Sequence, residues 1–123
     1  MKGIGCDCYA IPSNPFCFLK GDSMSTKLEN KYQSELRERI MAIFPDAQIL
    51  KNDSAYLTGV PDLTILNRNK WAWLEVKREP PGPNDFRPNQ EYYVAWAAER
   101  SFGATVFPQN ENEVLRALVE YFN

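Results

Sequence analysis

The chain of 123 residues contains no histidine. This absence excludes Ser-His-Asp and Cys-His nucleophilic catalysis, zinc fingers that mix cysteine with histidine, and any nuclease that uses histidine as its general base. An enzyme built from this sequence has to rely on carboxylates, lysine and a metal ion.

Cysteine is scarce and confined to one end of the chain, at Cys6, Cys8 and Cys17. Three thiolates lack the fourth ligand of a structural zinc site, and an odd number makes a poor disulfide framework. Residues 1–23 also lack the cationic start and apolar core of a signal peptide. We interpret residues 1–23 as an irregular N-terminal extension and residues 24–123 as the folded domain. A redox or metal role for the cysteines is the less favoured alternative.

Long apolar runs are also missing, since no stretch approaches the ~20 residues that span a bilayer. We therefore expect no membrane partner. The hydrophobic content of 44% is enough for one globular domain. The net charge of −2 excludes a protein coated in basic residues, but it is compatible with a nucleic-acid enzyme that has an acidic site.

Two β-strands are predicted at residues 59–66 and 71–77, which are rich in Val, Ile, Leu, Trp and Thr. The residues between them, 67–70, are polar and of hairpin length. The two strands should therefore pair antiparallel as a hairpin.

If Leu66 lies opposite Trp71 in this hairpin, then Asp62 lies opposite Glu75 on one face of the sheet. Lys77 projects from the same face, because strand side chains alternate. Two carboxylates and a lysine at one strand end predict a metal site with a cationic neighbour. The alternative is a solvated strand edge beside an ordinary Pro-Asp turn.

A first helix is predicted at residues 26–44, closed by Pro45. Glu29 falls inside its apolar stripe, where a carboxylate must be paired, hydrogen-bonded or bound to metal. Alternatively, Thr26 and Glu29 form a capping box, and the two interpretations are compatible. The stripe consists of Leu28, Tyr32, Leu36, Ile40 and Ile43.

The remaining elements are a strand at 47–51, a helix at 88–102, a strand at 103–107 and a helix at 111–122. Residues 78–85 contain three prolines and a glycine, so we expect an irregular flap there. Gln90 begins the apolar stripe of the second helix and is either a site residue or an ordinary helix former.

The order helix, three strands, helix, strand, helix predicts an α/β domain. The helix at 88–102 is long enough to cross between parallel strands. We therefore expect a mixed sheet of about four strands flanked by helices, in the order α-β-β-β-α-β-α.

Four features together resemble the PD-(D/E)xK nuclease superfamily, most closely its VRR-NUC-type branch. They are Glu29, the Gly-Val-Pro-Asp-Leu of residues 59–63, the Glu-Val-Lys of residues 75–77, and Gln90. The resemblance covers roughly residues 28–107. It implies a restriction-endonuclease-like core and a metal-dependent endonuclease that hydrolyses phosphodiester bonds in DNA, with branched or four-way junction DNA as the expected substrate.

Within this resemblance, Asp62, Glu75 and the Val76 carbonyl would bind Mg²⁺, with Mn²⁺ as a substitute, since hard cations prefer oxygen ligands. Lys77 would orient the attacking water or offset charge in the transition state. Glu29 would supply a further carboxylate, and Gln90 would contact Lys77, water or phosphate.

Basic residues around the hairpin and flap are expected to hold the sugar-phosphate backbone, which gives affinity without sequence reading. Cutting both strands with one site per chain favours a homodimer. A cytoplasmic protein of bacterial or phage origin is expected. The alternatives are a noncatalytic nucleic-acid or protein binding module and a nuclease for RNA or single strands. The expected nucleic-acid-binding residues are Lys51, Arg68, Lys70, Arg78 and Arg87.

Overall fold

The structure is a computed structural model that describes residues 5–6, 8–9, 24–82 and 89–123. The chain forms two compact units, Met1–Tyr32 and Gln33–Asn123. In the first unit, β1 (Gly5–Cys6) pairs antiparallel with β2 (Cys8–Tyr9). Helix α2 (Met24–Ile43) begins in this unit and runs on into the second. The predicted division after residue 23 stays a prediction.

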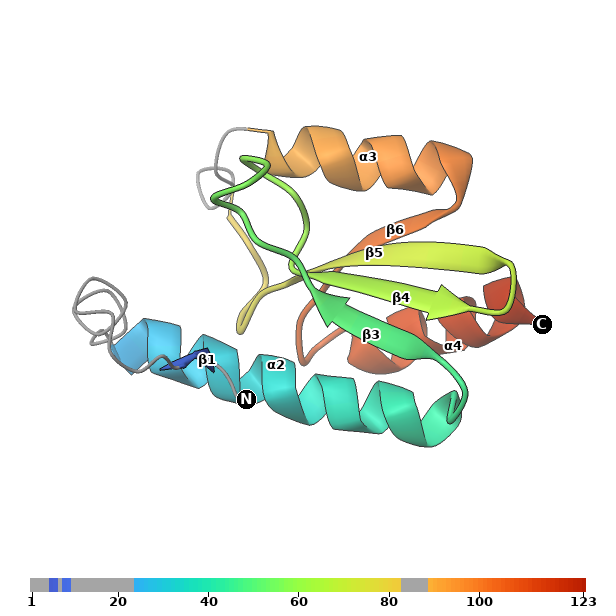
Figure 1. Cartoon of the computed structure of the whole chain (residues 1–123), viewed down its shortest axis with the longest axis horizontal. Coiled ribbons are helices and arrows are strands. Elements are labelled where there is room, and N and C mark those ends of the chain that lie inside the picture. The colour runs from blue at the N-terminus through green and yellow to red at the C-terminus, as the bar shows by residue number, and fades with distance from the viewer. Residues whose placement is uncertain (1–4, 7, 10–23, 83–88) are drawn as a thin grey trace. The chain divides into compact units, whose positions relative to one another are not determined.

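The second unit contains a four-stranded mixed sheet in the order β3-β4-β5-β6 (Figure 1). Its strands are β3 (Gln48–Lys51), β4 (Leu63–Asn67), β5 (Lys70–Val76) and β6 (Phe102–Val106). The first three pair antiparallel, whereas β5 and β6 are parallel. The predicted mixed α/β sheet is confirmed.

Helix α3 (Gln90–Arg100) connects the parallel strands and lies on one face of the sheet, as Figure 1 shows. Helix α4 (Glu111–Phe122) and residues 33–43 of α2 lie on the other face. The ring centroids of Phe44 and Phe122 are 5.2 Å apart, and Arg39 Nε lies 2.6 Å from Glu111 Oε2. These contacts join α2 and the residue directly after it to α4. None of the described helices has the length and apolar character needed to cross a membrane.

The side chains of β5 alternate between the two faces, as strand geometry requires. Ala72, Leu74 and Val76 are fully buried. Trp73 points to the other face, where its ring meets the α3 rings of Tyr93 at 6.1 Å and Trp96 at 5.5 Å. Odd-numbered residues of β5 therefore face α3.

The burial of α2 follows the predicted apolar stripe only in its middle. Leu36 and Ile40 are completely buried, but Leu28 is 37% exposed and Ile43 is 41% exposed. Phe44, directly after the end of α2, is buried in place of Ile43 and packs against Phe122. The predicted apolar stripe of α4 is confirmed, with Val114, Leu115, Leu118 and Phe122 all buried.

The prediction that the first hairpin strand begins at residue 59 was wrong, because β4 begins at Leu63. Gly59 has a left-handed φ of 90°, which is incompatible with a strand. Pro61 has no N–H to donate to a ladder. Asp62 therefore lies just outside the strand, at the end of an irregular segment.

Gly103 allows α3 to lie close to β6. A Cβ at this position would lie 2.8 Å from the Ala97 Cβ and 2.8 Å from the Ala98 amide nitrogen, and it would also contact the Val94 carbonyl. Two of these three neighbours are backbone atoms of α3, so the helix itself would have to move.

We expect Gly103→Ala to lower the free energy of unfolding by about 1–3 kcal/mol, because overpacking forces backbone shifts. Urea denaturation followed by circular dichroism measures this change. A loss below about 0.5 kcal/mol, the range of ordinary surface substitutions, would contradict the close approach of α3.

Candidate active site

The hairpin brings the two predicted carboxylates to the same level of the sheet. The register is confirmed, with Leu66 opposite Trp71 and Leu63 opposite Leu74. One pair further along, Asp62 is level with Glu75. The Val76 N–H donates a hydrogen bond to Asp62 Oδ2 at 2.8 Å. The Asp62 carboxylate therefore contacts β5 at the residue that follows Glu75.

Glu75 is buried, with 2% of its surface exposed. Its Oε2 accepts a hydrogen bond from Gln90 Nε2 at 2.8 Å and lies 3.4 Å from Lys77 Nζ. A buried carboxylate needs such partners, because losing hydration is costly for an ion. Gln90 is therefore a hydrogen-bond partner of Glu75, and its role as a site residue stays a prediction.

Two backbone features place these partners. The Lys77 N–H donates a hydrogen bond to the Val106 carbonyl at 2.9 Å. This bond continues the parallel pairing of β5 with β6 by one residue and fixes the backbone directly after β5. Asn89, with a left-handed φ of 73°, precedes Gln90, the first residue of α3. Glu75 is therefore at the N-terminal end of α3, where the helix dipole favours negative charge.

Asn52 is part of this arrangement, although the sequence analysis did not select it. Its side-chain amide donates to the Pro61 carbonyl at 2.8 Å and accepts from Thr64 Oγ1 at 2.8 Å. Its backbone N–H donates to the Asp62 carbonyl at 2.8 Å. The only signal in the sequence was a polar residue directly after a predicted strand.

The other predicted residues lie in different places. Glu29 belongs to the unit of residues 1–32, and its role in the site stays a prediction. Arg87 lies outside the described residues. Lys51 is exposed at the end of β3, next to Asn52. Arg78 directly follows Lys77, and its Nη2 lies 3.5 Å from Glu79 Oε2.

Arg68 and Lys70 lie at the hairpin turn, at the opposite end of β5 from Glu75. Lys70 lies five residues before Glu75 along β5, or roughly 17 Å away at ~3.3 Å per residue. Lys70 Nζ donates to the Tyr121 carbonyl at 2.8 Å, and Arg68 has a left-handed φ of 60°. The structure therefore places these two cations apart from the carboxylates.

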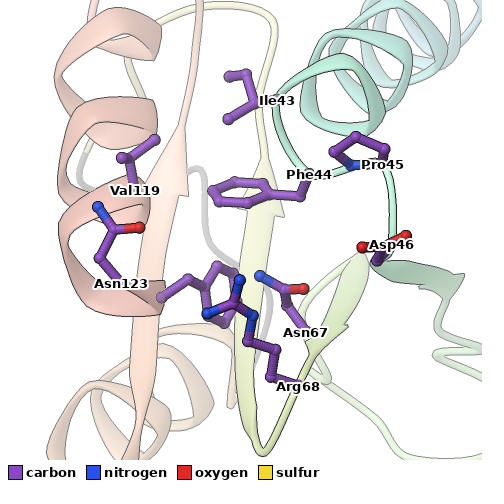
Figure 2. A pocket seen from close by; sticks show the side chains of 9 residues that line it. Ile43, Phe44, Pro45, Asp46, Asn67, Arg68, Val119 and Asn123 are labelled. Atoms are coloured by element: carbon purple, nitrogen blue, oxygen red, sulfur yellow. The ribbon is translucent and has the colours of Figure 1, made fainter.

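A cavity of about 210 Å³ lies beside this turn, and Figure 2 shows Arg68 and Asn67 along one side of it. Helices α2 and α4 supply the other walls through Ile43 and Val119 (Figure 2). Because the cavity is at the turn end of the hairpin, it is separate from Glu75. It is lined by Ile43, Phe44, Pro45, Asp46, Asn67, Arg68, Val119, Phe122 and Asn123.

The donor atoms at the site are compatible with Mg²⁺ or Mn²⁺. The described part of the chain contains no group of three or more His, Cys, Asp or Glu residues placed to hold a metal. Mg²⁺, however, is usually bound through one or two carboxylates, with water and substrate phosphate completing its shell. Asp62 and Glu75 supply two. A carboxylate has about four lone-pair sites, so an Asp62 that accepts the Val76 N–H can also coordinate a cation.

A mixed sheet flanked by helices, with Asp, Glu and Lys gathered at one strand end, defines a restriction-endonuclease-like α/β domain. The comparisons with known proteins agree on the fold. A solved structure titled "VRR_NUC domain" matches with a TM-score of 0.54 and 24% identity, over 78% of this chain and 98% of that one. No family model matches the chain, and no curated protein matches it. The predicted resemblance to a VRR-NUC-type domain is confirmed at the level of the fold.

We expect Lys77→Met to lower the free energy of unfolding by about 2–5 kcal/mol, because Glu75 loses its cationic neighbour while remaining buried. The double variant with Glu75→Gln should recover part of this loss. Urea denaturation of both single variants and the double variant gives the coupling energy. A coupling energy near zero would contradict the Glu75–Lys77 interaction.

Proposed function

We propose that the chain is a metal-dependent DNA endonuclease that hydrolyses phosphodiester bonds. The observation that supports this most directly is the position of Asp62 beside Glu75, with Lys77 and Gln90 on the same Glu75 oxygen. The VRR_NUC-like fold adds independent support.

Asp62, Glu75 and the Val76 carbonyl are the groups that would hold Mg²⁺, or Mn²⁺ in its place. When bound, such an ion polarises the phosphate and lowers the pKa of a coordinated water. Gln90 holds the Glu75 carboxylate in one orientation through its 2.8 Å hydrogen bond. Glu29 is proposed as a further carboxylate of the site.

Lys77 is the residue that contacts the reacting phosphate or water. Its side chain is 16% exposed, whereas that of Glu75 is 2% exposed, so Lys77 is the more accessible of the two. An ammonium group has three N–H donors, so Lys77 can contact a phosphate oxygen as well as Glu75. Positive charge fixed at this point offsets the charge that develops in phosphoryl transfer.

The proposed substrate is branched or four-way junction DNA, bound through its backbone by Lys51, Arg78 and Arg87. Arg68 and Lys70 would contact a second segment of DNA, since they lie at the far end of β5. A homodimer would provide one site for each strand of a junction.

Pure protein should cut DNA with Mg²⁺ or Mn²⁺, and Glu75→Ala or Lys77→Ala should lower the rate at least about 100-fold, the usual loss when one preorganised charge is removed. A gel assay with four-way junction, flap, linear and single-stranded DNA and with RNA measures rate and preference together. Glu113→Ala and Arg116→Ala on exposed positions of α4 are the matched controls and should cut normally. Equal cutting by Lys77→Ala would count against the proposal.

The alternative function is a noncatalytic binding module on the same scaffold. The absence of a three-ligand acidic cluster from the described residues favours it. Metal binding distinguishes the two. Isothermal titration calorimetry should show Mn²⁺ uptake by the wild type and a loss of about 10-fold or more in Asp62→Asn, because the amide is a weaker ligand for a hard cation. Absence of carboxylate-dependent uptake would favour the binding module.

A further inference from the structure

We propose that Asn52 is a positioning residue, which fixes the direction of the Asp62 side chain and thereby sets the affinity of the site for a divalent cation. The inference rests on the proposed function, because it assigns Asp62 as a metal ligand. Asn52 itself touches neither substrate nor metal in this proposal.

Asp62 has little regular structure to hold it. It precedes β4 by one residue and follows Pro61, which cannot donate a hydrogen bond. Gly59, two residues before Pro61, has a left-handed φ of 90°. The segment that leads into Asp62 therefore depends on hydrogen bonds from outside its own strand.

Asn52 binds the backbone on both sides of the Asp62 Cα atom. Its side-chain amide donates to the Pro61 carbonyl, in the peptide plane before Asp62, at 2.8 Å. Its backbone N–H donates to the Asp62 carbonyl, in the peptide plane after it, at 2.8 Å. When both planes are fixed, the Cα–Cβ direction of Asp62 is fixed too, and the carboxylate is directed at Val76.

The chemistry of asparagine suits this position. The amide is both a donor and an acceptor, and both capacities are used, because Thr64 Oγ1 donates to Asn52 Oδ1 at 2.8 Å. An aspartate would place a negative charge against the Pro61 carbonyl, and an alanine would make neither bond. The Thr64 contact comes from inside β4, so it anchors the amide to the sheet.

The test compares Asn52→Ala with Ser101→Ala, a control that loses the same kinds of contact at the other end of β5. Ser101 Oγ donates to the Trp71 carbonyl and shares a hydrogen bond with Tyr121 Oη at 2.6 Å. Both variants should lose a few degrees of melting temperature. By calorimetry, only Asn52→Ala should bind Mn²⁺ more weakly, by about 10- to 100-fold, the usual effect of removing a partner of a metal ligand.

Cleavage provides a second readout. In Asn52→Ala the Mn²⁺ concentration for half-maximal rate should rise by the same factor, while the rate at saturating Mn²⁺ should remain near that of the wild type. A purely structural role would lower the melting temperature and leave the Mn²⁺ midpoint unchanged, which would overturn the proposal.

A milder variant covers the case in which Asn52→Ala does not fold. Thr64→Val removes only the bond that anchors the Asn52 amide and should weaken Mn²⁺ binding about two- to ten-fold, the worth of one hydrogen bond. Wild-type affinity in Thr64→Val would then overturn the inference. If the wild type itself binds no Mn²⁺, the metal centre of the proposed function fails, and the inference fails with it.

Discussion

The arrangement of the second unit depends on a single buried carboxylate. Glu75 is 2% exposed and cannot remain ionised without partners, which come from two different elements. Lys77 extends the same strand, whereas Gln90 comes from the first residue of α3. The contact therefore fixes where α3 begins over the sheet. Gly103 then allows the rest of the helix to lie against β6.

The two faces of the sheet therefore differ in the side chains that they bury. The α4 face is an ordinary apolar core, closed by residues such as Leu36, Leu74 and Leu118. On the α3 face, the buried residues of the helix are Gln90 and Ala97, and tryptophan rings fill the space along β5. The Glu75 carboxylate can be buried on this face because the N-terminus of α3 and the Lys77 ammonium compensate for its lost hydration.

The hairpin was predictable because a short turn between two periodic strands leaves little freedom in register. The register, the fold class and the bounds of α4 all followed from local pattern. Asn52 could not be found in this way, since it is joined to Asp62 by a loop of nine residues whose geometry no short-range rule determines. The start of β4 was misplaced because Val60 and the apolar residues after Asp62 suggested one continuous strand. Gly59 instead has a left-handed φ, and Pro61 has no N–H for the ladder. For Gln90, composition alone could not separate the two interpretations.

The turn at Arg68 and Asn69 has a consequence at the far end of the hairpin. Because side chains alternate along a strand, the turn sets the phase of every later residue of β5. One extra residue there would send Glu75 and Lys77 towards α4 and bring Val76 towards α3. Two extra residues would restore the phase. The hairpin turn, at the opposite end of β5 from Glu75, thus tolerates changes of length only in even steps, unless a bulge absorbs the odd residue.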